Sequence, residues 1–203
     1  MSFKGIGSLL SKGKTVAFSL AVLITVRDHV IAVDKVKGSS MAPTLSPAHH
    51  ETGATDTVVI KRWEPARGLQ RGDIITFWKP HKPDEISIKR VVAFGGDTVW
   101  PRDREAMTRG HAHTRENYDL GGKKCLVVPY GHMWVEGDNW RESFDSNDFG
   151  PISKGLIDGK AVGVVREWRI AAIPEKRVEK GSTRVAIGKE QLPEIFLPLN
   201  SAH

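Results

Sequence analysis

Short runs of β-branched and aromatic residues, separated by turn-forming clusters, dominate the chain from residue 55 onward. Gly, Pro and Asp stand between the runs, and the periodicity of an amphipathic helix is nearly absent there. The runs are TDTVVIKRW, RGDIITFW, EISIKRVVAF, DTVW, KCLVVP, GHMWVEG and KAVGVVREW. Many short strands with turn signals between them are typical of all-β proteins. We therefore predict an all-β domain, either a sandwich or a coiled barrel.

A different pattern marks the N-terminal part, where residues 15–26 form one apolar run, TVAFSLAVLITV. Arg27, Asp28 and His29 interrupt it, and a second apolar run follows at residues 30–33. The first run is too short to span a bilayer, which needs about 20 residues. Three interpretations remain open for this segment: a buried helix, a cleaved secretory signal, and a weak membrane anchor.

Composition adds a basic balance and very few metal or disulfide candidates. The 203 residues allow one main domain with extensions. A net charge of +6 is compatible with nucleic acid, with an anionic membrane surface, or with no specific anionic partner. The basic residues are scattered without an aromatic RNA-binding pattern, so a membrane surface is favoured over nucleic acid. Cys125, the single cysteine, excludes an intramolecular disulfide and is expected to be a buried structural thiol. The close histidine groups, His49–His50 and His111 with His113, lack a third ligand and predict no metal site.

Two runs carry candidate chemistry. GSSMAPTL, residues 38–45, offers a serine hydroxyl on a turn, and a serine attacks an amide only when another group removes its proton. ISIKRVVAFGGD, residues 86–97, places Lys89 among apolar β-branched residues. Burial there would lower the lysine pKa from its usual value of about 10.4, and so would supply a neutral amine near pH 7. The two runs together indicate a Ser–Lys hydrolase.

Each run also has an ordinary structural interpretation. Ser and Pro are common in turns, and a lysine in a strand usually lies on a solvated face or edge. A third run, GDNWRESFDSNDFGP at residues 137–151, taken alone predicts a polar surface loop or a calcium loop. The presence of all three runs in one chain shifts the balance toward a catalytic site.

In this order, the runs resemble the motifs of the type I signal peptidase family of membrane-bound Ser–Lys proteases. SMAPTL resembles the nucleophile motif, RGDIITF the strand after it, IKRVVAFGGD the lysine motif, and GDNWRESFDSNDFG the last motif. The four motifs span roughly residues 36–165. The ending SNDFGP is similar to the branch of mitochondrial inner membrane protease subunit 2, because other branches usually carry an arginine where this chain has Asn147.

The resemblance implies roles for individual residues. It makes Ser40 the nucleophile, with its backbone N–H as the main oxyanion donor, and Lys89 the general base. Ser143 resembles the hydroxyl that orients the lysine. Asp145 resembles the acid that holds the last motif in place.

Gly38 and Met41, on either side of the two serines, complete the predicted site. Some bacterial members have a serine as a second oxyanion donor where this chain has Gly38, so a second donor must come from elsewhere or be absent. Ser39 is expected to point away from the site, because neighbours on an extended segment alternate. Trp140 replaces an arginine that is common after Gly-Asp-Asn in the family.

The resemblance also divides the chain. Residues 1–36 form an N-terminal segment with a membrane-anchor helix at about 15–33, and residues 37–170 form the Ser–Lys peptidase domain. A polar stretch at about 101–122 is expected to be an insertion within that domain. Residues 171–203 are a C-terminal tail outside the resemblance.

The function implied by the resemblance is a membrane-anchored serine endopeptidase without a cofactor. It would remove sorting or signal peptides from precursors that reach the mitochondrial intermembrane space. Its partners would be extended precursor peptides, a sister catalytic subunit of the inner membrane protease complex and the lipid bilayer, with no nucleic acid.

Three alternatives stay open at this point. The nearest is a bacterial or plastid type I signal peptidase. A self-cleaving repressor would need a DNA-binding helix-turn-helix before Ser40, where residues 1–37 offer an apolar run. A basic β-barrel that binds nucleic acid without enzymatic activity is the alternative of another class.

Overall fold

The computed structural model describes residues 4–102, 117–120, 123–166, 169–174 and 183–189. The described helices are α1 (Lys4–His29), α2 (His49–Thr52), α4 (Ser146–Phe149) and the 3-10 helix η1 (Lys154–Leu156). The described strands are β1 (Ile31–Lys35), β2 (Thr57–Lys61), β3 (Ile74–Lys79), β4 (Lys82–Phe94), β5 (Thr98–Trp100), β6 (Asn117–Leu120), β7 (Lys123–Val127), β8 (His132–Glu136), β9 (Ile152–Ser153), β10 (Ile157–Arg166), β11 (Arg169–Ala171) and β12 (Arg184–Ala186).

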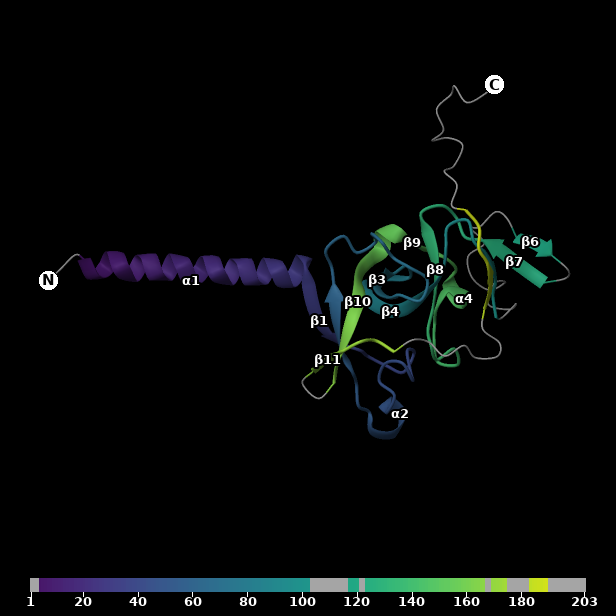
Figure 1. Ribbon diagram of the computed structural model, residues 1–203, viewed down its shortest axis with the longest axis horizontal. Coiled ribbons are helices and arrows are strands. Elements are labelled where there is room, and N and C mark those ends of the chain that lie inside the picture. The colour runs from purple at the N-terminus through teal and green to yellow at the C-terminus, as the bar shows by residue number, and fades with distance from the viewer. Residues whose placement is uncertain (1–3, 103–116, 121–122, 167–168, 175–182, 190–203) are drawn as a thin grey trace, which may run out of the picture.

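Two antiparallel sheets make up the body of the molecule (Figure 1). The larger has the strand order β1-β2-β10-β3-β4-β8-β9, with β11 paired to β10. The smaller has the order β12-β5-β7-β6. The prediction of an all-β fold is therefore confirmed, and the runs rich in Val, Ile and aromatic residues form its strands because such side chains pack well on a pleated sheet.

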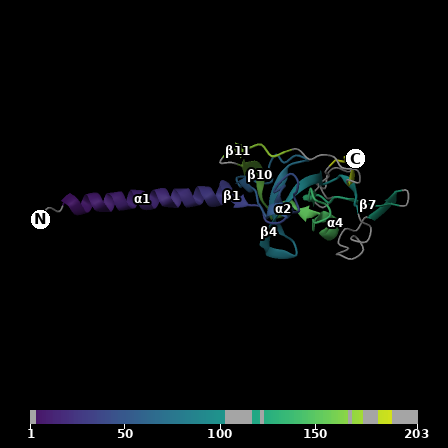
Figure 2. The same ribbon diagram turned by 90° about the horizontal axis from the view of Figure 1, so that it is seen from below.

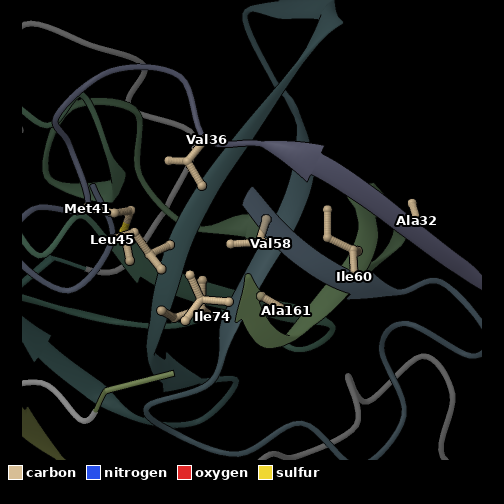
Figure 3. Close-up of a cluster of buried hydrophobic side chains, with 9 residues drawn as sticks. Ala32, Val36, Met41, Leu45, Val58, Ile60, Ile74 and Ala161 are labelled. Atoms are coloured by element: carbon tan, nitrogen blue, oxygen red, sulfur yellow. The ribbon is translucent and has the colours of Figure 1, made fainter. Parts of the chain in front are cut away.

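The turn that follows β1 packs into the hydrophobic core beside the larger sheet. Met41 and Leu45, from that turn, are fully buried and pack in one cluster with Val58, Ile60 and Ile74 from β2 and β3. Figure 3 shows these side chains meeting from different strands. Burying a side chain of this size is worth about 1.5–3 kcal/mol, so the core fixes the turn against the sheet.

Strand β4 changes character along its 13 residues. Its first half is exposed, whereas Val91 and Ala93 in its second half are buried. Lys89 lies between the two halves and is paired in register with the buried Ile75 of β3. The pairing of β4 with β8 begins only at Arg90, so the first half of β4 pairs with β3 alone among the described strands.

The helix predicted at residues 15–33 is present, but its C-terminal boundary differs from the prediction. Helix α1 extends away from the sheets (Figures 1 and 2) and ends at His29, and β1 then pairs with β2. The residues after Arg27 and Asp28 include β-branched Val and Ile, which favour a strand. Ala32 is buried opposite Ile60 of β2, so pairing with β2 stabilises a strand here instead of a longer helix. Among the described residues, no helix is both long and apolar enough to cross a membrane.

The predicted insertion at 101–122 lies mostly outside the described residues, which include β6 from it. From the predicted tail, residues 171–174 and 183–189 are described; Ala171 ends strand β11, and strand β12 pairs with β5. Cys125 in β7 is fully buried, as predicted for a structural thiol.

Candidate active site

Ser40 lies on the turn between β1 and the core. Gly38 has a φ of +80°, a backbone conformation that glycine adopts without a steric penalty, and it directs the chain out of β1. The next residues form a tight turn in which the Leu45 N–H donates to the Met41 carbonyl at 2.9 Å. Because Met41 is fully buried, the half-buried Ser40 is held at the edge of the core with its hydroxyl directed toward β4.

Lys89 reaches this hydroxyl from the middle of β4. A hydrogen bond of 2.8 Å joins Lys89 Nζ to Ser40 Oγ, and Lys89 is only 4% exposed. Burial lowers the pKa of Lys89 from 10.5 to about 8; the nearby Asp145 opposes this, Lys79 adds to it, and Asp138 opposes it. A lysine with a pKa of about 8 is neutral in a substantial fraction of molecules near pH 7–8, so Lys89 Nζ can accept the proton of the Ser40 hydroxyl.

The run at 137–151 folds over this pair as a loop and the short helix α4. Asp145 is the N-cap of α4: its Oδ1 accepts from the Asn147 N–H at 3.1 Å, and the Asp148 carboxylate accepts from the Asp145 N–H at 2.9 Å. Its Oδ2 accepts from Ser143 Oγ at 2.7 Å and from the Gly137 N–H at 2.9 Å. Asp145 therefore connects Gly137, at the start of the loop, with Ser143 and with the first turn of α4.

Gly137 lies where the loop meets the nucleophile turn. A Cβ at this position would lie 2.2 Å from Ser143 Oγ and 2.5 Å from the Ser40 carbonyl oxygen, so only glycine fits. The Asn139 N–H also donates to that carbonyl at 3.0 Å. The structure therefore brings together the predicted residues Ser40, Lys89, Ser143 and Asp145, although Ser143 bonds to Asp145 in this state.

The neighbouring serine has a separate environment. Ser39 donates its hydroxyl to Glu142, whose carboxylate also lies 3.2 Å from His50 Nε2. Ser39 therefore points away from Lys89, as expected for a neighbour of Ser40. Gly38 has no side chain to donate, and Trp140 is half exposed, with the Arg141 guanidinium 4.8 Å from the centre of its ring.

Asp56 and Arg166, which the sequence analysis did not identify, also hold the nucleophile turn in place. Asp56 accepts from the Ser46 N–H at 2.8 Å, and Arg166 pairs with Asp56 at 2.6 Å while donating to the Thr44 carbonyl at 3.2 Å. Burial alone would raise the pKa of Asp56, but the bonds from Arg166 and Ser46 lower it below its ordinary value. Asp56 and Arg166 are 110 residues apart in the chain, and only the pairing of β2 with β10 brings them together.

A cleft of about 820 Å³ opens beside Ser40 and Lys89. One wall is the end of β1 and the residues after it, and the other is the exposed first half of β4. Apolar and aromatic side chains line much of it: Val36, Val58, Ile60, Trp78, His81, Ile86, Ile88, Phe144 and Phe149. Phe144 follows Ser143 directly, is 56% exposed, and packs edge-on against His81 with ring centres 4.9 Å apart.

Metal ligands are not gathered at this site. Within the described ranges, no group of three or more His, Cys, Asp or Glu side chains is arranged to hold a metal ion. His111 and His113 lie outside the described residues.

The sequence of this chain is similar to those of known proteins over most of its length. A model of the family described as signal peptidase, peptidase S26, matches residues 9–168. Mitochondrial inner membrane protease subunit 2 of Mus musculus is 39% identical over 155 residues, which cover 76% of this chain and 77% of the mouse protein. Subunit 2 of Saccharomyces cerevisiae is 40% identical over 146 residues, or 71% of this chain and 73% of the yeast protein. Subunit 1 of the same yeast is 31% identical over 160 residues, or 77% of this chain and 80% of its own.

Proposed function

We propose a cellular role for this chain from the fact that it belongs to the signal peptidase family, peptidase S26. The resemblance predicted from the sequence is thereby confirmed, and the chain is a serine endopeptidase of the signal peptidase type. The proposed role is the removal of sorting peptides from precursors at the mitochondrial inner membrane, on its intermembrane-space side. The names of the similar proteins support a location at the mitochondrial inner membrane. The motif ending in SNDFGP supports a place in the subunit 2 branch of the family.

The observation that carries the proposed mechanism is the 2.8 Å hydrogen bond between Lys89 Nζ and Ser40 Oγ. Ser40 Oγ attacks the scissile carbonyl carbon while neutral Lys89 takes its proton. Lys89 then gives that proton to the leaving amine, and the N-terminal part of the substrate stays on Ser40 as an ester. Lys89, neutral again, takes a proton from water as the water oxygen attacks the ester carbonyl carbon. Lys89 then gives this proton to Ser40 Oγ as the ester bond breaks, which restores the serine hydroxyl and the neutral lysine.

The oxyanion that forms in both steps needs hydrogen-bond donors. We assign this role to the backbone N–H of Ser40. Removing one such donor from a protease typically costs about 2.7–4 kcal/mol of transition-state stabilisation. Gly38 has no side chain, and the Ser39 hydroxyl bonds to Glu142, so neither residue supplies a side-chain donor to the oxyanion. The backbone N–H of Ser40 is therefore the main donor in this proposal.

The substrate binds in the cleft as an added strand. The first half of β4, before Lys89, pairs only with β3 among the described strands, so its other edge can accept an extended peptide. That edge and the residues after β1 face the same cleft as Ser40. A peptide paired there would place successive side chains alternately against the apolar wall and toward solvent.

A sister catalytic subunit is the proposed partner, since the similar proteins are named as subunits of one protease. The alternatives of a bacterial or plastid signal peptidase share this chemistry and differ in compartment. The non-enzymatic nucleic-acid-binding alternative is disfavoured by membership of a peptidase family.

The test is a deletion of this chain followed by mass-spectrometric profiling of protein N-termini in isolated mitochondria. We expect a small set of intermembrane-space proteins to keep their sorting peptides, and to be cut again when the wild-type chain or Ser39→Ala is restored. Ser40→Ala should not restore cutting. An unchanged N-terminal profile in the deletion strain would refute the role, and rescue by Ser40→Ala would refute the nucleophile.

A further inference from the structure

The segment 183–189, which lies beyond the family match at 9–168, docks on the side of the catalytic loop. Its strand β12 pairs with β5, and Val185 packs against the core cluster around Trp134. The Gly188 N–H donates to the buried Asp97 at 2.9 Å, and a Cβ on Gly188 would lie 1.9 Å from the Gly96 carbonyl oxygen. The segment is therefore closely fitted to the domain.

Its first residue, Thr183, donates its hydroxyl to Glu136, the last residue of β8. Glu136 is 1% exposed and has several further partners. Trp134 Nε1 donates to its Oε1 at 2.8 Å, and Arg102 Nη2 lies 3.1 Å from its Oε2. A buried carboxylate is stable only when such partners satisfy it, so Glu136 fixes the groups that bond to it.

One of these groups is the side-chain amide of Asn147. Its Nδ2 donates to Glu136 Oε1 at 3.1 Å and to Asp145 Oδ1 at 2.9 Å, and its Oδ1 accepts from the Arg102 N–H at 3.0 Å. The amide therefore joins two acidic side chains. Through Asp145, the bonds continue to Ser143 at 2.7 Å and to the Gly137 N–H at 2.9 Å, beside Ser40.

We propose that Thr183 and Glu136 are positioning residues, which hold Asn147 and through it Asp145 and Ser143 in place beside the catalytic pair. The C-terminal segment is then part of the active-site scaffold. This inference rests on the proposed roles of Ser40 and Lys89, since positioning has meaning only relative to them. Displacement of a catalytic group by about 1 Å can cost about a hundredfold in rate, and loss of one supporting bond at the rim of the loop should cost less.

The experiment uses the full chain and a peptide spanning a cleavage site found by the N-terminal profiling. Thr183→Val keeps the shape of the side chain but removes the donor, and Thr183→Ser restores it. Arg184→Ala is the matched control. Arg184 is the exposed neighbour of Thr183, its guanidinium carbon lies 5.9 Å from the centre of the Trp100 ring, and it takes part in none of the hydrogen bonds described above. Active-site titration gives kcat per competent molecule, and thermal unfolding is measured in parallel.

We expect Thr183→Val to lower kcat about tenfold with KM unchanged within about twofold, and Thr183→Ser and Arg184→Ala to behave as wild type. A wild-type kcat in Thr183→Val, a loss that vanishes once only competent molecules are counted, or a loss that Thr183→Ser does not rescue would overturn the inference. Ser40→Ala separates the two proposals: if it cleaves the peptide, the proposed mechanism has failed, whereas an inactive Ser40→Ala beside a fully active Thr183→Val refutes only the positioning role.

Discussion

Replacing Lys89 by methionine is predicted to stabilise the folded protein at pH 6 while abolishing catalysis. The folded state holds this lysine at 4% exposure, and burial is the main cause of its pKa of about 8 against an ordinary 10.5. Each tenfold change in proton affinity is worth about 1.4 kcal/mol, so the lowered pKa corresponds to about 3 kcal/mol of strain when Lys89 is charged. Methionine removes that cost, and it loses the bond to Ser40, worth about 1 kcal/mol.

The sign of the pH dependence follows from proton binding. Below pH 8 both the folded and the unfolded chain hold the proton, so the full cost is present. Between pH 8 and 10.5 the unfolded chain binds more protons than the folded chain, so wild-type stability gains relative to the variant as pH rises. We expect Lys89→Met to be more stable by about 2 kcal/mol at pH 6, and this advantage to shrink by about 3 kcal/mol across that window.

Urea unfolding followed by tryptophan fluorescence at pH 6, 7, 9 and 10 measures this difference. Lys61→Met is the matched control, because Lys61 is an exposed lysine in β2 and its replacement should change stability little at every pH. A Lys89→Met variant that is less stable than wild type at pH 6, or whose stability difference does not depend on pH, would refute the argument that Lys89 carries a costly buried charge.

Three further predictions concern Lys89, the loop at residues 137–151 and Ser39. The value of kcat/KM should rise with pH with an apparent pKa near 8, and a flat profile from pH 6 to 9 would exclude Lys89 as a titrating base; Lys89→Arg should be inactive because guanidinium keeps its proton. Asp145→Ala should lower the free energy of unfolding by about 2–3 kcal/mol and should also lower kcat, whereas Ser143→Ala should lower kcat alone. Calorimetry and peptide kinetics measure the two effects, and the opposite pattern in the two variants would contradict these roles. Ser39→Ala should keep most of the activity, since its hydroxyl bonds to Glu142, and an inactive Ser39→Ala with an active Ser40→Ala would reverse the assignment.

The sequence predicted the all-β fold, because strand formation depends on local patterns. Short β-branched runs specify strands, and the serine and lysine runs each carry their own turn and strand signals. The contact between Ser40 and Lys89 was inferred from a resemblance, and the order of strands explains it: β1 leads into the nucleophile turn, and β4 crosses beside it.

Other features depend on pairings that no local pattern shows. In the sequence, residues 31–33 look like the end of an apolar helix, but in the structure they pair with strand β2. The bonds of Asp56 with Arg166, and of Glu136 with Thr183, join residues 110 and 47 positions apart, so nothing near either residue in the chain indicates its partner.

The most direct test of the catalytic pair is the identification of the acylated residue during turnover. A peptide ester acylates a serine faster than an amide does, so the covalent intermediate accumulates and can be trapped by acid quench and located by peptide mass spectrometry. We predict one adduct, on Ser40, which forms faster as the pH rises toward 8 and is absent in Lys89→Met. An adduct on Ser39, or an adduct on Ser40 that forms at the wild-type rate in Lys89→Met, would contradict this prediction.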